Sequence, residues 1–338
     1  MKVAQFEKPH VLKVTTKPLR TLNEGEVLVQ VQACGVCGTD VHIVDGTSRS
    51  TPPVVLGHEY AGIVTDVAKG TTGPSVGEHV GVDPNISCGT CFYCRRGLIH
   101  LCSSLRALGV DIDGGMAEYC IVPVKQTYVL PQDMAFELST LIEPVSCAIH
   151  GIDLARIRSG DTVVILGGGT IGLIMLQLAR NAGAALLIII EPLGHKRAIA
   201  RELGADVVLD PSTTNIQSAL FDLTHVGADV VIECVGKPQT IEIALELVRR
   251  GGLVEFFGVC PIGERISVEP NAVYFKELTI VGSYVNPHTF DRSIAMLQSG
   301  RVRIDKFLIH KFPLEGVHEA LQYQREGRTI KSIVQPNV

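Results

Sequence analysis

Four cysteines lie close together in the first third of the sequence. They form the pattern C-x2-C-x2-C-x7-C, made by Cys88, Cys91, Cys94 and Cys102. Four thiolates at this spacing can surround one tetrahedral Zn²⁺ and complete its shell, which leaves no position for water or substrate. The pattern therefore predicts a structural zinc site that stabilises a polar loop. An iron–sulfur cluster and four unrelated thiols are the alternatives.

A second set of possible metal ligands is spread along the sequence. Cys37 lies in C-G-V-C-G-T-D-V-H, His58 and Glu59 are adjacent, and Glu143 lies in L-I-E-P. One thiolate, one imidazole and one carboxylate would hold zinc and leave one position open. An open zinc lowers the pKa of a hydroxyl that binds to it, as the oxidation of an alcohol requires. Taken singly, His58 could be a core histidine and Cys37 a small buried apolar side chain.

A glycine-rich turn follows the apolar run 163–166. Its sequence G-G-G-T-I-G supplies the three glycines of the motif G-x-G-x-x-G and the two residues between the last two of them: Gly167, Gly169, Thr170, Ile171 and Gly172. The first glycine permits a tight turn, the second lets the backbone approach a pyrophosphate, and the third lets the helix pack on the strand. The phosphates would bind at the positive end of a helix that begins near Thr170.

An acidic residue, Glu191, follows the next apolar run, 186–190. A carboxylate at this place can bond the ribose 2′-hydroxyl and would repel a 2′-phosphate, so we expect NAD rather than NADP. Lys196 and Arg197 are near and weaken this preference. The alternative is that Glu191 is only a surface carboxylate at the end of a strand.

The elements that must position these residues change in character near Ser146. Before it, short alternating runs such as 26–32 and 63–67, bounded by glycine and proline, predict an all-β domain. After it, apolar runs alternate with amphipathic segments such as 196–203 and 240–248. Six apolar runs are found, at 163–166, 186–190, 207–209, 230–232, 253–257 and 278–281. This alternation predicts a doubly wound parallel sheet with helices on both faces, and an α/β protein.

The alternation ends after about residue 284. Segments 290–298 and 314–323 predict amphipathic helices, and 329–334 predicts a strand. We therefore expect a dinucleotide-binding domain, 147–285, inserted into a discontinuous catalytic domain, 1–146 and 286–338.

Composition excludes several classes of partner. The 338 residues are 46% hydrophobic with a formal net charge of −5, enough for one large or two medium domains, each with its own core. No basic run indicates a nucleic-acid partner. The longest uncharged stretch, 162–179, is too rich in glycine to span a membrane. The first residues do not resemble a signal peptide, and clustered cysteines favour metal binding over disulfides, so we expect a cytoplasmic protein.

Taken together, these segments resemble the zinc-containing medium-chain dehydrogenase/reductases. The family's motifs G-V-C-G-T-D-V-H (35–42), G-H-E-Y-A-G (57–62), the four-cysteine lobe and the glycine turn occur in the family's order. The resemblance implies a GroES-like β domain plus a doubly wound Rossmann domain. It also implies two zinc ions per chain, NAD, and a homotetramer or homodimer in which an edge strand near 278–281 pairs across the interface.

The resemblance further implies which residues act at the zinc. Cys37 and His58 would bind the catalytic ion, and Glu59 would bind it or support it from behind. Glu143 would supply a further ligand, directly or through water.

Three more roles follow from the same resemblance. Thr39 would take the proton of the substrate hydroxyl, and His42 would relay that proton through the cofactor ribose to solvent. Lys331 would lie near the cofactor phosphates.

Glutamate at position 143 favours the polyol branch of the family, because simple alcohol dehydrogenases have cysteine there. These enzymes oxidise a secondary alcohol of a sugar alcohol to a ketone with NAD. Segment 282–287 lacks the arginine that is usual in sorbitol dehydrogenases, which makes D-arabitol-like substrates at least as plausible as sorbitol.

An L-threonine-type or a simple secondary-alcohol dehydrogenase is the alternative within the family. Threonine dehydrogenases usually have a histidine just before the cysteine lobe. The threonine type is disfavoured because the corresponding segment here, V-D-P-N (82–85), has none. The non-enzyme alternative, a nucleotide-binding redox sensor, would have lost metal-site residues, and a zinc-independent enone or quinone reductase would lack both metal sets.

Overall fold

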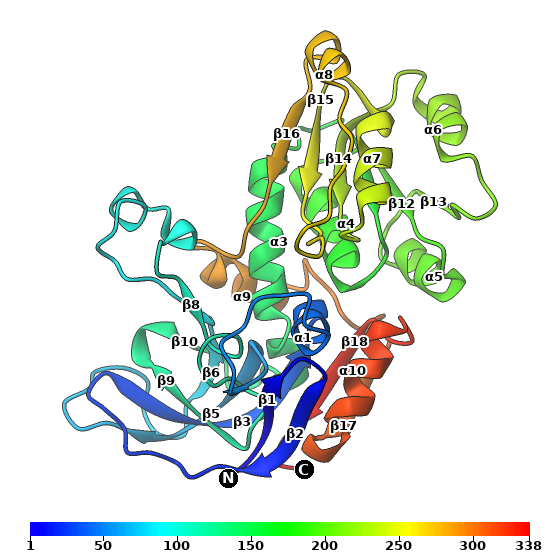
Figure 1. Ribbon diagram of the computed structural model, residues 1–338. Helices are drawn as coiled ribbons and strands as arrows, with labels where there is room; N and C mark the ends of the chain where they lie inside the picture. The colour runs from blue at the N-terminus through cyan, green and yellow to red at the C-terminus, as the bar shows by residue number, and fades with distance from the viewer. The chain divides into compact units, whose positions relative to one another are not determined.

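The computed structural model describes residues 1–338, which form two compact units (Figure 1). The first unit comprises Met1–Pro144, Asn286–Gln298 and Phe307–Val338, and the second comprises Val145–Val285 and Ser299–Lys306. The sequence had assigned 299–306 to the first domain. They lie in the second because the Gln177 side chain donates a hydrogen bond to the carbonyl of Arg303 at 3.1 Å and accepts one from its N–H at 2.8 Å.

The first unit is built on a seven-stranded sheet of order β10-β6-β5-β3-β18-β17, with β9 also paired to β3. These strands are β3 (Glu26–Val36), β5 (Glu59–Val67), β6 (His79–Val82), β9 (Tyr119–Pro123), β10 (Thr127–Val129), β17 (Ile309–Pro313) and β18 (Lys331–Gln335). A smaller sheet has the order β2-β1-β4, made by Val11–Thr16, Lys2–Lys8 and Val54–Val55. A two-stranded sheet pairs β7 (Asn85–Ile86) with β8 (Arg106–Ala107).

Strand β3 shows why this unit folds as a sheet. Val27, Val29 and Val31 are fully buried and alternate with partly exposed residues, as expected for a strand with one face on a core. They join one apolar cluster with side chains of the other strands and of α10 (Val317–Arg325). The unit's other helices are α1 (Gly38–Val44), α2 (Phe136–Ser139) and α9 (Phe290–Gln298). The GroES-like β domain is therefore confirmed.

The second unit is a doubly wound Rossmann fold, as predicted. Its six parallel strands have the order β13-β12-β11-β14-β15-β16. Successive strands are added on one side of β11 up to β13 and on its other side from β14 on, so the switch point lies between β11 and β14. The strands are β11 (Thr162–Leu166), β12 (Leu186–Ile190), β13 (Val207–Leu209), β14 (Ala228–Glu233), β15 (Val248–Phe256) and β16 (Thr279–Gly282). Dinucleotides bind at such a switch point, outside the carboxyl ends of the strands.

Helices accompany this sheet along the chain. They are α4 (Thr170–Ala182), α5 (Gly194–Glu202), α6 (Ile216–Thr224), α7 (Pro238–Leu247) and α8 (Pro270–Lys276), while α3 (Ile142–Ala155) begins in the first unit and continues into the second. Figure 1 shows α5, α6 and α7 around the strands of this unit. No helix combines the length and the apolar character that crossing a membrane would require.

One carboxylate inside the second unit has no hydrogen-bond partner. Glu255 of β15 is fully buried, and neither of its carboxylate oxygens forms a hydrogen bond. A methyl group added at Gly151 of α3 would lie 2.6 Å from Glu255 Oε1, which shows how tightly the helix backbone covers it. Burial raises the pKa of Glu255 from 4.5 to about 8. The side chain is therefore mainly protonated and neutral near pH 7.

Glu255→Gln should change how stability depends on pH. The folded-state pKa of Glu255, about 8, lies above the unfolded value of 4.5, so the folded state holds the extra proton between these limits. Its stabilising contribution is complete below the unfolded pKa and is lost as pH rises through the folded pKa, with a slope of up to about 1.4 kcal/mol per pH unit. Glutamine cannot ionise, so the variant should gain stability relative to wild type as pH rises. Urea unfolding of both proteins between about pH 6 and pH 9 measures this difference, and parallel pH profiles would contradict it.

Candidate functional site

The structure brings together Cys37, His58 and Glu59. One ligand atom of each, a sulfur, an imidazole nitrogen and a carboxylate oxygen, lies within 4.8 Å of the others. Cys37 follows β3 and is the N-cap of α1, while His58 and Glu59 lie at the start of β5. The antiparallel register pairs Gly35 of β3 with Glu59 of β5, so the two strands deliver these side chains to one place. The donor set suits Zn²⁺.

A buried aspartate, Asp40, supports two of these residues. It is fully buried, accepts a hydrogen bond from the Cys37 N–H at 2.8 Å, and holds its other oxygen 3.5 Å from His58 Nδ1. Burial alone lowers the pKa of His58, but Asp40 and the Cys37 thiolate raise it well above the ordinary value. A carboxylate behind a ligating histidine fixes the orientation of the ring. Asp40 is not among the residues predicted from the sequence, although its three-residue spacing from Cys37 is that of a helix capping box.

Glu59 also forms a buried ion pair with Lys331. The Lys331 ammonium donates a hydrogen bond to the Glu59 carboxylate, and the two residues are 1% and 2% exposed. Burial lowers the pKa of Lys331, but Glu59, Cys37 and Glu143 together outweigh burial, and the net pKa is raised. The pair passes over β3 at Gly35, where a methyl group would lie 2.7 Å from Lys331 Cε. Lys331 therefore has a carboxylate partner in the first unit, a different partner from the phosphates that the resemblance implied.

Glu143 lies outside the group formed by Cys37, His58 and Glu59. It is buried in the first turn of α3, and its negative charge contributes to the raised pKa of Lys331. Its role as a metal ligand stays a prediction.

Thr39 and His42 both lie on α1, close to the metal group. Thr39 Oγ1 is 3.6 Å from the Cys37 sulfur. His42 Nδ1 lies 3.1 Å from Thr47 Oγ1, so this ring nitrogen forms a hydrogen bond with the threonine that follows the helix. The two residues are three positions apart in a helix and therefore lie on neighbouring parts of one face.

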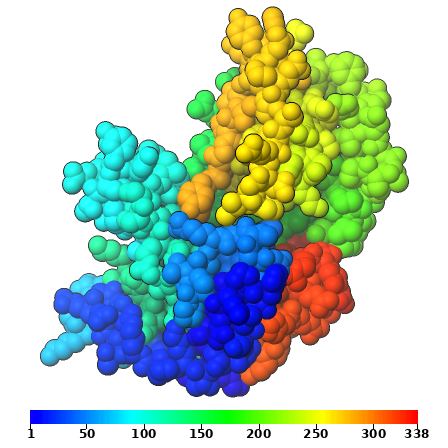
Figure 2. Space-filling view, viewed as in Figure 1, coloured from blue at the N-terminus to red at the C-terminus, as the bar shows by residue number.

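The four predicted lobe cysteines also converge. Their sulfur atoms lie within 4.8 Å of one another, as four ligands of a single ion would: Cys88, Cys91, Cys94 and Cys102. Figure 2 shows this cyan segment standing out from the rest of the first unit. The Cys91 N–H lies 3.3 Å from the Cys88 sulfur, and bonds from Thr90 and Cys91 lower the Cys88 pKa to about 5. A thiolate stabilised in this way is the form that binds zinc.

The glycine turn has the geometry of a dinucleotide-binding loop. Gly167 has a φ of 99°, which favours glycine, and a side chain at Gly172 would overlap the Gly167 carbonyl oxygen. Gly169 is the N-cap of α4, and Thr170 and Ile171 form its first turn. A side chain at Gly169 would meet no atom within 4 Å, so the backbone there is open to a ligand. The residues present therefore fit a pyrophosphate at the start of α4.

Glu191 lies against this turn. Its Oε2 accepts a hydrogen bond from the Gly168 N–H at 2.7 Å, and its Oε1 accepts one from the Leu193 N–H at 2.9 Å. The residue is only 5% exposed. The carboxylate is thus held beside the glycine loop, where the ribose of a dinucleotide would be recognised.

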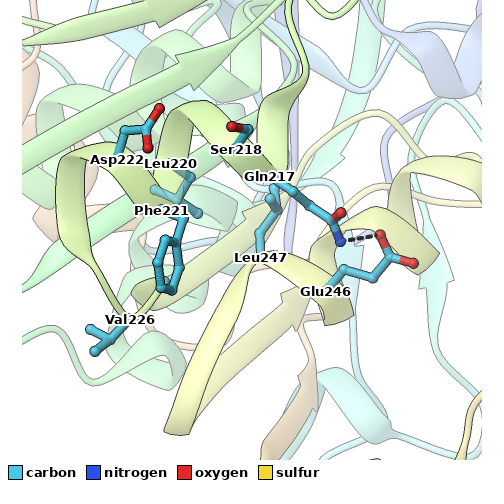
Figure 3. A pocket seen from close by; sticks show the side chains of 9 residues that line it. Gln217, Ser218, Leu220, Phe221, Asp222, Val226, Glu246 and Leu247 are labelled. Atoms are coloured by element: carbon cyan, nitrogen blue, oxygen red, sulfur yellow. Dashed lines mark hydrogen bonds between the residues drawn. The ribbon is translucent and has the colours of Figure 1, made fainter.

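A separate surface pocket of about 390 Å³ lies between α6 and α7 of the second unit (Figure 3). Gln217 and Glu246 approach one another across it through a hydrogen bond of 2.7 Å. None of the metal-site, cofactor or proton-transfer candidates lines this pocket. The candidate sites are therefore the converging ligands of the first unit and the glycine turn of the second.

Comparison with known proteins identifies the family of this chain. The model of the alcohol dehydrogenase GroES-like domain matches residues 23–132, and the zinc-binding dehydrogenase model matches residues 170–299. D-arabinitol dehydrogenase 1 of Uromyces fabae is 33% identical over 341 aligned residues, with 100% of this chain and 97% of that protein covered. The chain belongs to the zinc-binding medium-chain dehydrogenases. It is therefore an oxidoreductase of the alcohol dehydrogenase type.

Two further members of this dehydrogenase family show how broad the resemblance is. The L-threonine 3-dehydrogenase of Pyrococcus abyssi is 36% identical, covering 91% of this chain and 90% of that protein. A crystal structure described as a zinc-binding dehydrogenase from Sinorhizobium meliloti, bound to NADP, is 38% identical with a TM-score of 0.95 over 99% of both chains. Family membership thus fixes the class of chemistry and leaves open the substrate and the choice of NAD or NADP.

Cys94→Ser should damage the lobe without touching the Cys37 group. It removes one of four converging sulfur ligands, and loss of a structural metal is a large-effect change, so the melting temperature should fall by more than about 5 °C. Bound zinc should fall as well. Cys260→Ser, at a cysteine outside both metal groups, is the matched control. Metal analysis and thermal unfolding measure both effects; a Cys94 variant as stable and zinc-rich as the control would contradict a structural zinc lobe.

Proposed function

We propose that this protein is a zinc-dependent, NAD-dependent dehydrogenase that oxidises a secondary alcohol of a polyol or sugar alcohol to a ketone. The observation that carries the proposal is the convergence of Cys37, His58 and Glu59, in a chain that also has a glycine turn beside Glu191. The thiolate, imidazole and carboxylate suit a catalytic zinc with an open position, and the turn suits a dinucleotide.

The metal ligands have distinct tasks in this mechanism. When bound, zinc would act as a Lewis acid that makes the substrate hydroxyl more acidic. Cys37 and His58 hold the ion, and Asp40 holds the His58 ring in a fixed orientation, as its 3.5 Å contact with Nδ1 supports. Glu59 either completes the ligand set or stays on Lys331, and Glu143 supplies a further ligand directly or through water.

Two side chains of α1 would move the substrate proton. Thr39 Oγ1 would accept the proton of the substrate hydroxyl while its own hydroxyl proton passes on to the cofactor ribose, and its position 3.6 Å from the Cys37 sulfur supports this role. His42 would receive the proton that leaves through the ribose of a bound cofactor and release it to solvent. Because its Nδ1 is engaged by Thr47 Oγ1 at 3.1 Å, Nε2 is the atom that takes part in the relay.

The four lobe cysteines form a second metal group, so we propose two zinc ions per chain, one at each group. The four sulfur ligands of the lobe would close the coordination shell of an ion, which would leave no position for substrate and give that ion a structural role.

NAD is the proposed cofactor because of Glu191. Its buried carboxylate, held by the Gly168 N–H, can accept a hydrogen bond from a ribose 2′-hydroxyl and repels a 2′-phosphate. The Sinorhizobium meliloti protein binds NADP, so a relative 38% identical to this chain has the other cofactor. Lys331 contributes less to the choice of cofactor than Glu191, because its ammonium is already paired with Glu59.

A polyol is favoured over L-threonine as the substrate. The resemblance to D-arabinitol dehydrogenase covers the whole chain, and Glu143 is typical of the polyol branch. Threonine enzymes usually have a histidine just before the cysteine lobe. Here Asn85 occupies that segment, and its side-chain amide donates a hydrogen bond of 2.6 Å to Asn286.

The proposed assembly is a homodimer or homotetramer, working in the cytoplasm, where its ten free thiols would stay reduced. Strand β16 is an edge of the parallel sheet, and Tyr274 and Phe275 of the preceding helix are 79% and 69% exposed. An edge strand beside exposed aromatic side chains supports pairing with a second copy.

The substrate and cofactor can be tested together. Arabitol, sorbitol, xylitol, an inositol, L-threonine and simple secondary alcohols should each be offered with NAD and with NADP, and the reduced cofactor followed by absorbance. We expect the highest kcat/KM for a polyol with NAD. A highest value for L-threonine would overturn the substrate class, and a higher value with NADP would overturn the cofactor.

Cys37→Ser should separate catalysis from cofactor binding. Loss of the thiolate ligand should lower kcat by more than about a hundredfold, since a metal Lewis acid supplies several kcal/mol of transition-state stabilisation. NADH binding should persist, because the glycine turn and Glu191 belong to the second unit. Steady-state kinetics and NADH titration measure the two effects, and Cys34→Ser is a neighbouring-thiol control. Turnover at the wild-type rate in the Cys37 variant would refute the zinc role.

A further inference from the structure

Arg197 is held in place at the end of β12 by contacts on both of its terminal nitrogens. Nη1 donates hydrogen bonds of 2.7 Å to the carbonyls of Glu191 and Pro192, and Nη2 lies 2.8 Å from Asp210 Oδ2. The Arg197 and Asp210 side chains are each only 19% exposed. A guanidinium held by two carbonyls and a largely buried carboxylate is not free to follow a mobile ligand.

Asp210 occupies the same edge of the sheet as Glu191. Strands β12 and β13 are parallel neighbours, with Ile190 paired to Leu209, and the Glu191 N–H donates to the Leu209 carbonyl at 3.0 Å. The residues that follow these two strands, Glu191 and Asp210, are therefore adjacent at the carboxyl end of the sheet. This is the end at which doubly wound folds bind nucleotides.

Each carboxylate is oriented by its own loop. Asp210 Oδ1 accepts hydrogen bonds from the Ser212 N–H at 2.9 Å and from its hydroxyl at 2.5 Å, which leaves Oδ2 for Arg197. Glu191 is held by the N–H groups of Gly168 and Leu193. The Arg197 side chain thus joins the backbone of Glu191 to the side chain of Asp210.

This arrangement matters for a cofactor with a ribose 2′-phosphate. Such a phosphate carries close to two negative charges and would meet Glu191, so its binding needs a cation that can turn towards it. Arginine is the best such partner, because its planar guanidinium bonds phosphate oxygens in pairs. Arg197 lies beside this site, because it donates a hydrogen bond to the Glu191 carbonyl, but its positive charge is paired with Asp210.

We propose that Asp210 is a positioning residue for cofactor selectivity: by holding the Arg197 guanidinium, it withholds this cation from a 2′-phosphate and so reinforces the preference for NAD. The inference rests on the proposed function, which supplies the preference for NAD. It explains why a chain with an arginine beside the ribose site would still favour NAD. It predicts that the preference can be relaxed without changing Glu191.

Asp210→Asn tests the inference by binding rather than by turnover. Asparagine keeps the shape and can still accept from the Ser212 N–H, but it removes the charge that holds Arg197. The ratio of the Kd for NADPH to the Kd for NADH should fall by about tenfold, almost entirely through tighter NADPH binding. Titration with each reduced cofactor, read from nicotinamide fluorescence, gives both constants, and the chain has no tryptophan to interfere.

A double variant shows whether Arg197 carries the effect. In Arg197→Gln/Asp210→Asn the gain in NADPH affinity should disappear, whereas a merely structural Asp210 would give the same ratio with or without the arginine. Asp222→Asn, an exposed carboxylate of α6, is the matched control for the loss of one negative charge and should leave the ratio unchanged. Asp210→Ser serves as the second variant if Asp210→Asn does not fold, because its hydroxyl can also accept from the Ser212 N–H.

The outcomes separate this inference from the proposed function. If wild type binds NADPH more tightly than NADH, the proposed cofactor is wrong, and the ratio in the variant still decides the role of Asp210. If wild type prefers NADH but Asp210→Asn leaves the ratio unchanged, the inference is wrong and the proposed function stands. A large loss of NADPH affinity in Arg197→Gln alone would also overturn the inference, since it would mean that Arg197 already serves the phosphate.

Discussion

The buried ion pair between Glu59 and Lys331 is the constraint on which the metal group depends. Its partners come from β5 and β18, which lie on either side of β3, and β3 leads directly into Cys37. Both charges are almost completely removed from water, so either residue alone would be an unpaired buried charge, which is strongly destabilising. The pair can cross β3 only because residue 35 is glycine. This electrostatic contact therefore joins the two strands that flank β3, while the backbone pairing of β3 with β5 brings Cys37, His58 and Glu59 together.

Local features of the site could be predicted from the sequence, and long-range partnerships could not. The four lobe cysteines span fifteen residues, and the glycine turn spans six, so spacing alone defines their geometry. The six strands of the second unit were recognised because each is a short apolar run followed by a helical segment. Their order in the sheet is that of a doubly wound fold.

The partner of Lys331 is 272 residues away in sequence, and no periodic pattern connects the two. The same holds for residues 299–306, whose place in the second unit depends on the amide of Gln177 on α4. Asp40 is an intermediate case. Its spacing from Cys37 is a recognisable capping signal, but its second contact, with His58, depends on the pairing of β3 with β5.

The carboxyl edge of the parallel sheet shows how environment assigns different tasks to similar residues. Glu191 is held by backbone N–H groups beside the glycine turn, and Asp210 is held by Ser212 and Arg197. Glu233 accepts hydrogen bonds from the N–H groups of Val235 and Gly236, which shapes the loop after β14. Each of these carboxylates has donors and fixes a loop. Glu255, without any donor, is a neutral acid inside the fold at neutral pH.

The division of candidate residues between the two units bears on how the activity could vary among relatives. Every metal-ligand candidate lies in the first unit, and the glycine turn and Glu191 lie in the second. The hydrogen bonds and ion pair of Glu191 and Asp210 stay within the second unit, so we expect substitutions at the ends of β12 and β13 to leave the metal-ligand candidates of the first unit undisturbed. Lys331 is the exception among the expected cofactor residues. It belongs to the first unit, and its ammonium already balances the charge of Glu59, so replacing it would disturb the metal group before it affected any phosphate.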